Sequence, residues 1–250
     1  MPELARREPN RFVFVNCPFD SEYTGLFRAI CFAIIYCGFR PRCALERIDS
    51  SETRIAKICD LVGACDFGVH DLSRTELCPP GGLPRFNMPF ELGLFLGCKY
   101  FGDEMQGRKS ALILDRERYR YRQFLSDISG QDPESHERKP ELAIAVVRNW
   151  LRTQAGELLP GAFCIHRLFL AFQQDLPAIC RQCRLEDWEM CFEDLMAVMR
   201  LWLKAHWSED SAIVSGDDQQ TPFAIAAGIS SGRGGNIGRV GRAQAHTGGD

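Results

Sequence analysis

The sequence predicts an α/β fold, a doubly wound parallel sheet of four or five strands followed by a C-terminal helical extension. Short, continuously apolar runs recur along the first half of the chain, as they do in strands that are buried on both faces of a parallel sheet. Segments with apolar residues at helical spacing separate these runs, so strands and helices alternate. Beyond residue 139 only the helical pattern remains, which predicts the extension.

The first strand and helix form the first half of a β-α-β unit. The run Phe-Val-Phe-Val at residues 12–15 is the first predicted strand, and a loop follows it at residues 16–20. Ser21 can cap the next helix, because a serine oxygen accepts hydrogen bonds from free backbone N–H groups. Apolar positions then recur at helical spacing until Gly38, which ends the helix.

Three further strands are predicted. Residues 39–45 are a weaker candidate, and a helix starting at Ser50 or Ser51 follows them. The third strand covers residues 65–69, where the small Gly68 would allow another backbone to approach closely. The fourth is the apolar run Ala-Leu-Ile-Leu that ends at residue 114.

The helix before the fourth strand is apolar on nearly every side. Asn87 is a good N-cap and Pro89 suits the first turn, so we expect this helix to start at Met88. Glu91 is the single carboxylate in its first turns. A buried carboxylate must be paired, hydrogen-bonded or placed against a cavity, which makes Glu91 the leading catalytic candidate. Its alternative role is a local one, a favourable interaction with the helix dipole.

The second half of the chain is predicted to be helical. Residues 116–122 are strongly basic and are interpreted as a solvated face, while residues 119–128 fit either a helix or a further strand and helix. A polar break follows at residues 131–139. Amphipathic patterns then cover residues 140–153, 162–174 and 185–207. The last of these patterns carries an aromatic stripe that includes Trp188 and Trp202, which we expect to be core.

Composition divides the chain into four parts. These are a flexible arm at residues 1–10, an α/β domain at 11–130, the helical extension at 138–207, and a glycine-rich tail at 208–250. The tail is predicted to be disordered because it has too few apolar residues to offset its ordering entropy. We expect the extension to pack on the sheet domain or to join copies of the chain in a homo-oligomer.

Charge and hydropathy exclude several classes of partner. The formal net charge of -3 argues against binding to nucleic acid, and no apolar run is long enough to span a membrane. With no signal-peptide pattern at the N-terminus, the sequence predicts a cytoplasmic protein. Its 12 cysteines are then expected to be buried free thiols, and no zinc-site spacing supports a metal site.

Polar residues follow the predicted strands at their carboxyl ends. Asn16 and Asp20 follow the first strand, and Asp71 and Ser73 follow the third. In doubly wound sheets, ligands bind beyond the carboxyl ends of the strands where the strand order reverses. We therefore expect these side chains to gather around Glu91. Each is also a common turn residue, so a purely local role is the alternative.

Three stretches together resemble a known family. They are the sequence FVNCPFD at residues 14–20, HDLS at 70–73 and NMPFELG at 87–93. They resemble the nucleoside 2-deoxyribosyltransferase-like group and are similar to the TIR-like proteins of bacteria. Both groups share a flavodoxin-like sheet and a catalytic glutamate on a helix beside the crevice, a position that Glu91 matches. The resemblance covers residues 11–115; Asn87 departs from it, because many TIR enzymes have a serine or cysteine there.

The resemblance implies cleavage or transfer at the N-glycosidic bond of a nucleotide or nucleoside. NAD would then be a substrate, no cofactor is expected, and a role as a bacterial defence effector follows from the TIR-like proteins. Glu91 would stabilise the positive charge that develops on the sugar, with Asp71 as the second catalytic residue. The implied substrate-binding residues are Asn16, Phe19, Asp20, Ser73 and Asn87. The alternatives are a catalytically inactive nucleotide-sensing module and an adaptor that only self-associates.

Overall fold

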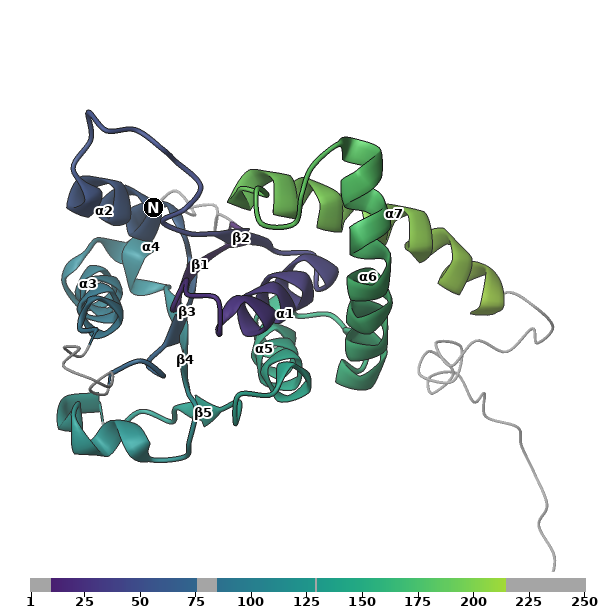
Figure 1. Ribbon diagram of the computed structural model, residues 1–250. Coiled ribbons are helices and arrows are strands. Elements are labelled where there is room, and N and C mark those ends of the chain that lie inside the picture. Colours follow the sequence, from purple (N-terminus) through teal and green to yellow (C-terminus); the bar gives the residue numbers. More distant parts are fainter. Residues whose placement is uncertain (1–9, 76–84, 129, 215–250) are drawn as a thin grey trace, which may run out of the picture. The chain divides into compact units, whose positions relative to one another are not determined.

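A computed structural model describes residues 10–75, 85–128 and 130–214 (Figure 1). Its sheet has five strands in the order β2-β1-β3-β4-β5, and every neighbouring pair is parallel. This order confirms the predicted α/β, flavodoxin-like sheet. The strands are β1 (Phe12–Asn16), β2 (Arg40–Arg42), β3 (Phe67–Asp71), β4 (Ser110–Asp115) and β5 (Glu134–Ser135).

Helices cover both faces of the sheet (Figure 1). The described helices are α1 (Thr24–Tyr36), α2 (Arg54–Ala64), α3 (Asn87–Phe101), α4 (Glu104–Gly107), α5 (Pro140–Ala155), α6 (Ala162–Cys183) and α7 (Phe192–Val214), with short 3₁₀ helices η1 (Arg120–Gln123) and η2 (Ser126–Ile128). Side chains of β1 alternate between the faces, as the pleat of a strand requires. Val13 and Val15 join the core under α1 and α5, whereas Phe14 joins the core under α2 and α3.

The helical extension shares a core with α1. The ring centroid of Phe32 on α1 lies 5.5 Å from that of Phe169, 5.6 Å from that of Phe172 and 6.1 Å from that of Trp202. Most of the predicted aromatic stripe is therefore core. Trp188 is 82% exposed, contrary to expectation, because it lies in the connection before α7, where helical spacing does not apply.

Several predicted helix starts were wrong. Helix α2 starts at Arg54 and not at Ser50 or Ser51, because the Thr53 hydroxyl accepts the hydrogen bond of its first turn. Helix α1 starts at Thr24, and Ser21 lies in a turn before it. Helix α3 starts at Asn87, one residue earlier than predicted, and Phe86 occupies the N-cap position.

The segment between β4 and α5 differs most from the prediction. Residues 119–128 form two 3₁₀ helices, and the polar break at 131–139 contains β5. The basic segment 116–122 is not wholly solvated, because Arg120 is 8% and Tyr121 1% exposed. These side chains are buried by tertiary contacts that their polar neighbours in sequence do not reveal.

The chain divides into two compact units, residues 1–205 and 206–250. The first holds the sheet, and the described part of the second is the last stretch of α7. Residues 1–9 of the predicted arm (1–10) and residues 215–250 of the predicted tail (208–250) lie outside the described residues, whereas residues 208–214 belong to α7. Among the helices that are described, none combines the length and apolarity needed to cross a membrane. The described cysteines are all free thiols, and six of these 11 are buried.

Candidate functional site

Strand order places the candidate site at the carboxyl ends of β1 and β3. The chain leaves β1 towards β2 on one side, while β3 lies on the other, so the strand order reverses between β1 and β3. Asn16 and His70 are partners in the register of these two strands. Loops that follow the two strands diverge here, which leaves room for a ligand.

Glu91 lies on the inner side of α3 and is 3% exposed. Its cationic partner is Arg54, whose Nη2 atom is 3.7 Å from Glu91 Oε1, and that oxygen makes no hydrogen bond to a described residue. Burial raises the pKa of Glu91 above its usual value, and the Arg54 guanidinium only partly opposes this. Glu91 is thus a carboxylate whose charge the protein stabilises poorly.

A pocket of about 410 Å³ lies near Glu91 but is not lined by it; Arg54, the cationic partner of Glu91, is part of the lining. Asn87 lines it one helical turn before Glu91, and Arg54 lines it from the start of α2. The ring of Phe19 is 37% exposed and also borders the pocket. Its complete lining is Cys17, Pro18, Phe19, Asp20, Arg54, Arg85, Asn87 and Met88. Its size and mixed apolar and cationic lining suit a small organic anion.

Asn16 lies behind this pocket and is 2% exposed. Its Nδ2 atom donates to the Met88 carbonyl oxygen over 2.8 Å and lies 3.1 Å from His70 Nδ1. Burial lowers the pKa of His70 to about 3, so the ring is neutral and its Nδ1 can accept the second hydrogen bond. Asn16 therefore joins the end of β1 to the first turn of α3, which positions the helix that carries Glu91.

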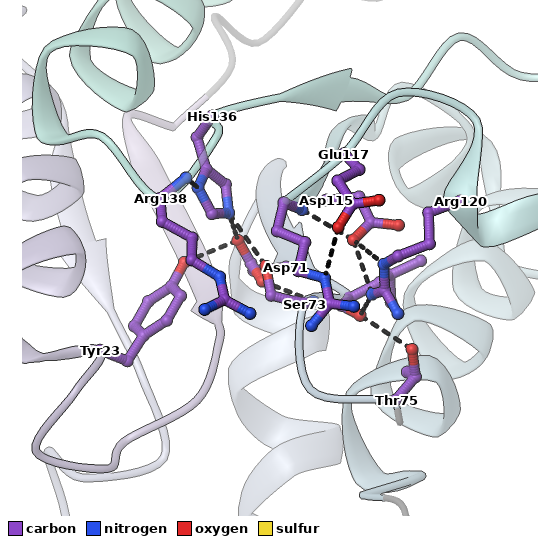
Figure 2. Close-up of polar contacts among 11 residues, drawn as sticks. Tyr23, Asp71, Ser73, Thr75, Asp115, Glu117, Arg120, His136 and Arg138 are labelled. Carbon is purple, nitrogen blue, oxygen red and sulfur yellow. Dashed lines mark hydrogen bonds and ion pairs between the residues drawn. The ribbon is translucent and has the colours of Figure 1, made fainter. Parts of the chain in front are cut away.

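Asp71 is the centre of a second, fully buried cluster (Figure 2). Its Oδ2 accepts a hydrogen bond from the Tyr23 hydroxyl over 2.7 Å and lies 2.9 Å from His136 Nε2. Its Oδ1 accepts the Ser73 backbone N–H over 2.8 Å. Burial alone would raise the pKa of Asp71, but these donors, with His136 the strongest, lower it below its usual value. In contrast to Glu91, Asp71 is a well-stabilised anion.

The Asp71, His136 and Ser73 side chains do not form a nucleophilic triad. The Arg138 backbone N–H donates to His136 Nδ1 over 2.9 Å, so the ring hydrogen of the neutral imidazole is on Nε2. Nε2 is also the atom that lies 2.9 Å from Ser73 Oγ. A triad needs an accepting nitrogen beside the serine, and this nitrogen is a donor.

Asp20 lies between the pocket near Glu91 and the cluster around Asp71. It is hydrogen-bonded to Arg74 Nη2 over 3.1 Å and to Arg85 Nη1 over 3.3 Å. Asp20 and Arg85 line the pocket beside Glu91, whereas Arg74 lines a smaller cavity near Ser73. One carboxylate held by two guanidinium groups thus separates the two cavities.

A buried ion pair lies on the far side of Asp71 (Figure 2). Arg120 donates to Asp115 Oδ1 over 2.9 Å from Nε, and its Nη2 donates to the Leu72 carbonyl oxygen over 2.6 Å. Burial raises the pKa of Asp115, and Arg120 lowers it in part. The pair joins the loop after β3 to the end of β4, which fixes the loop that carries Ser73.

The predicted site residues therefore fall into two groups. Four lie at or behind the pocket beside Glu91, namely Asn16, Phe19, Asp20 and Asn87, while Asp71 and Ser73 belong to the neighbouring cluster. Sequence reasoning missed Tyr23, Arg54, Arg74 and His136, which lie in helix starts and polar loops. A larger cavity of about 670 Å³ between α3, β4 and α5 contains none of the predicted site residues.

The described residues contain no group of three or more histidine, cysteine or acidic side chains that could hold a metal ion. No family model matches the chain, and a search of curated proteins finds no significant match.

Proposed function

We propose that the protein cleaves or transfers at the N-glycosidic bond of a nucleotide or nucleoside. The observation that supports this most directly is Glu91, a buried carboxylate with an incompletely satisfied oxygen beside a pocket of about 410 Å³. Carboxylates with perturbed pKa values beside a cleft are candidates for catalysis on physical grounds. The resemblance of the surrounding sequence to deoxyribosyltransferase-like and TIR-like proteins gives the same reaction class.

The chemistry follows from the poor stabilisation of Glu91 in the free protein. As an N-glycosidic bond breaks, the sugar acquires positive charge at its anomeric carbon. A carboxylate whose cationic partner is half exposed and 3.7 Å away gains a closer cation in the transition state, and only such differential interactions accelerate a reaction. Glu91 would stabilise this charge or form a covalent glycosyl intermediate, and water or a second base would then take the sugar.

The pocket lining supplies the remaining contacts in this proposal. The exposed ring of Phe19 stacks on a base, and the Asn87 amide hydrogen-bonds a ribose hydroxyl. Arg54 has a 57% exposed side chain, so it can turn from Glu91 to an anionic group of the substrate and leave the carboxylate to the sugar. Asp71 and Ser73 do not line this pocket, and we assign them a positioning role.

Release of free base from NAD and from nucleosides tests the proposal. We expect Glu91→Gln to lower turnover by at least about a hundredfold, because the amide cannot stabilise the sugar cation. Glu104→Gln is the matched control, because the Glu104 side chain is 82% exposed and should leave turnover unchanged. Turnover that survives in Glu91→Gln would contradict the mechanism. Adding a second free base and measuring a new nucleoside separates a transferase from a hydrolase.

A second candidate function is a catalytically inactive nucleotide-sensing module. The observation that favours it is that Glu91 is 3% exposed and does not line the pocket, whereas its partner Arg54 does. If Arg54 stays in place when ligand binds, Glu91 cannot reach a sugar. Saturable nucleotide binding without any release of base would support this function over the first.

A further inference from the structure

Helix α3 is apolar on the side away from the sheet as well as on the side that packs against it. Its 15 residues include only two charged side chains, Glu91 and Lys99. Glu91 is buried, and Lys99 Nζ donates to the Gly107 carbonyl oxygen over 3.3 Å, at the end of α4. A helix that is apolar on every side is normally covered on every side, so the outward side of α3 is suited to a contact with another molecule.

We call this outward side the α3 outer face. It consists of five residues at helical spacing, namely Phe86, Phe90, Gly93, Gly97 and Phe101. Its three rings and that of Tyr100 beside them are between 57% and 91% exposed. An aromatic side chain can bury about 150–250 Å², so these four rings expose roughly 400–700 Å² together. This area reaches that of the largest apolar patch on a typical monomer, about 300–600 Å², and such patches are often functional contacts.

Two glycines lie in the middle of the α3 outer face. A Cβ atom added to Gly93 or to Gly97 would meet no atom within 4 Å, so the space outside the helix is open at both positions. Because glycine has no side chain, the backbone of another molecule can approach α3 closely there. Exposed aromatic side chains lie on either side of this centre, Phe90 before it and Phe101 after it. The face therefore fits a second helix.

The side chains of α3 are spaced so that the face matches a second copy of itself. Phe90 and Phe101 are equally far from the point between residues 95 and 96, and so are Leu94 and Gly97. If two copies of α3 cross antiparallel at this point, Phe90 of each copy meets Phe101 of the other, and each Leu94 meets a glycine. Every contact of a two-fold interface occurs twice, so this one arrangement covers both ends of the face.

Charges at the ends of α3 favour the same direction. Arg85 precedes the helix, at the positive end of its dipole, and its side chain is half exposed. Asp103 and the exposed Glu104 follow the helix at its negative end. An antiparallel pair brings the cationic end of one copy to the acidic end of the other, whereas a parallel pair brings like charges together.

We propose that the α3 outer face binds a second copy of this chain in an antiparallel, two-fold dimer. Each partner buries about 800 Å² in a standard interface, and this patch is smaller, so we expect a dissociation constant of about 1–100 μM. Arg85 and Asn87 line the pocket near Glu91 and flank Phe86 in the sequence, so the interface adjoins the candidate site. The proposal does not depend on the proposed reaction, and it places the contact on α3 instead of on the helical extension.

Sedimentation velocity of the full chain, at concentrations on both sides of this dissociation constant, tests the dimer. We expect Phe90→Glu and Phe101→Lys each to weaken it at least about tenfold, because each buries a charge against an aromatic ring of the partner. A carboxylate near the start of a helix and an ammonium group near its end suit the helix dipole, so both variants should fold. Circular dichroism of each variant checks this.

The double variant Phe90→Glu/Phe101→Lys tests the direction of the two helices. In an antiparallel pair the introduced carboxylate of each copy meets the introduced ammonium group of the other. We therefore expect the double variant to dimerise at least about tenfold more tightly than either single variant. In a parallel pair like charges would meet, and the double variant would be no better than the single ones.

Phe163→Lys is the matched control, because Phe163 is an exposed phenylalanine on α6 in the helical extension. It should leave the dissociation constant unchanged. A chain that stays monomeric at every concentration, or a dimer that Phe90→Glu and Phe101→Lys do not weaken, overturns the proposal. Loss of the dimer in Phe163→Lys would place the interface on the extension and overturn it too. A double variant that does not recover contradicts the antiparallel arrangement on which the proposal rests.

Discussion

Asp71 and Glu91 are two buried carboxylates whose surroundings shift their pKa values in opposite directions. Asp71 has three hydrogen-bonding partners, so its pKa is lowered despite burial. Among the described residues Glu91 has one guanidinium partner, Arg54 at 3.7 Å, which does not offset the rise in pKa that burial causes. Such a divergence commonly separates a structural or anionic role from a reactive one. In the proposed function, Asp71 has the stabilising role and Glu91 the reactive one.

This contrast predicts a pH-dependent loss of stability in Asp71→Asn. Because the folded pKa of Asp71 is lowered, its ionised form stabilises the fold at neutral pH, and this contribution is lost as the pH falls from about 5 through the folded pKa. We expect the variant to lose about 3 kcal/mol of unfolding free energy at pH 7. Urea denaturation at a series of pH values should show the difference from wild type shrinking at acidic pH. A difference that is constant with pH would contradict the account.

Glu91 could be found from the sequence because its environment is local. The residues around it in α3 are apolar, so the sequence alone predicts that the carboxylate is buried. His136 and Arg120 could not be found in this way. Both lie in polar segments, and they are buried only because β3 and β4 bring Asp71 and Asp115 beside them. No periodic pattern encodes contacts of this kind.

At the scale of elements, β3 and α3 are held together at Gly68. A Cβ atom on this residue would lie 2.6 Å from His70 Nε2 and 2.9 Å from a ring carbon of Phe95. The sequence predicted a close approach here, but of another backbone; the approaching atoms belong to side chains. The absence of a side chain at Gly68 therefore allows the Phe95 ring to pack on β3, which sets the distance of α3 from the sheet.

Substitutions of two glycines should have effects of opposite sign. Gly68→Ala forces buried rings to move, and we expect it to cost about 1–3 kcal/mol of unfolding free energy. Gly93 on α3 is exposed and has open space at its Cβ position, so Gly93→Ala should add up to about 1 kcal/mol through helix propensity. Thermal denaturation of both variants measures this. A stabilising Gly68→Ala would show that α3 does not pack against β3 as described.

The elements that sequence predicted well are those whose pattern is long or fully apolar. Strands β1 and β4 are continuous apolar runs, and both appear where expected. Strand β5 has two residues, pairs only with the end of β4, and lies in a polar segment, so no pattern marks it. Helix α6 continues beyond its predicted end at residue 174, because Leu176 and Cys180 extend its buried face past Pro177.

At the scale of the whole first unit, α1 and α5 pack on one face of the sheet, and α6 and α7 pack against α1. Buried residues of the sheet, α1, α5, α6 and α7 form one continuous cluster. The Phe27 ring of α1 also contacts Phe192 at the start of α7, with 6.2 Å between centroids. The extension is therefore part of the core that supports the candidate site. The predicted homo-oligomer through the extension remains a prediction, which light scattering in solution can measure.

Because the core is shared, we expect a cavity-forming substitution in α6 to destabilise strand β1 as well. Phe172 is fully buried against Phe32, and we expect Phe172→Ala to cost about 3–5 kcal/mol. Phe163 lies on the same helix but is 82% exposed, so Phe163→Ala should change stability by less than about 0.5 kcal/mol. If the unit unfolds cooperatively, some amides of β1 exchange only when the whole unit unfolds. For these amides, the free energy of exchange should fall in Phe172→Ala by the same amount as the free energy of unfolding. Hydrogen exchange measured by mass spectrometry compares both variants with wild type. Faster exchange confined to α6 and α7 would mean that the extension unfolds independently and does not support the sheet.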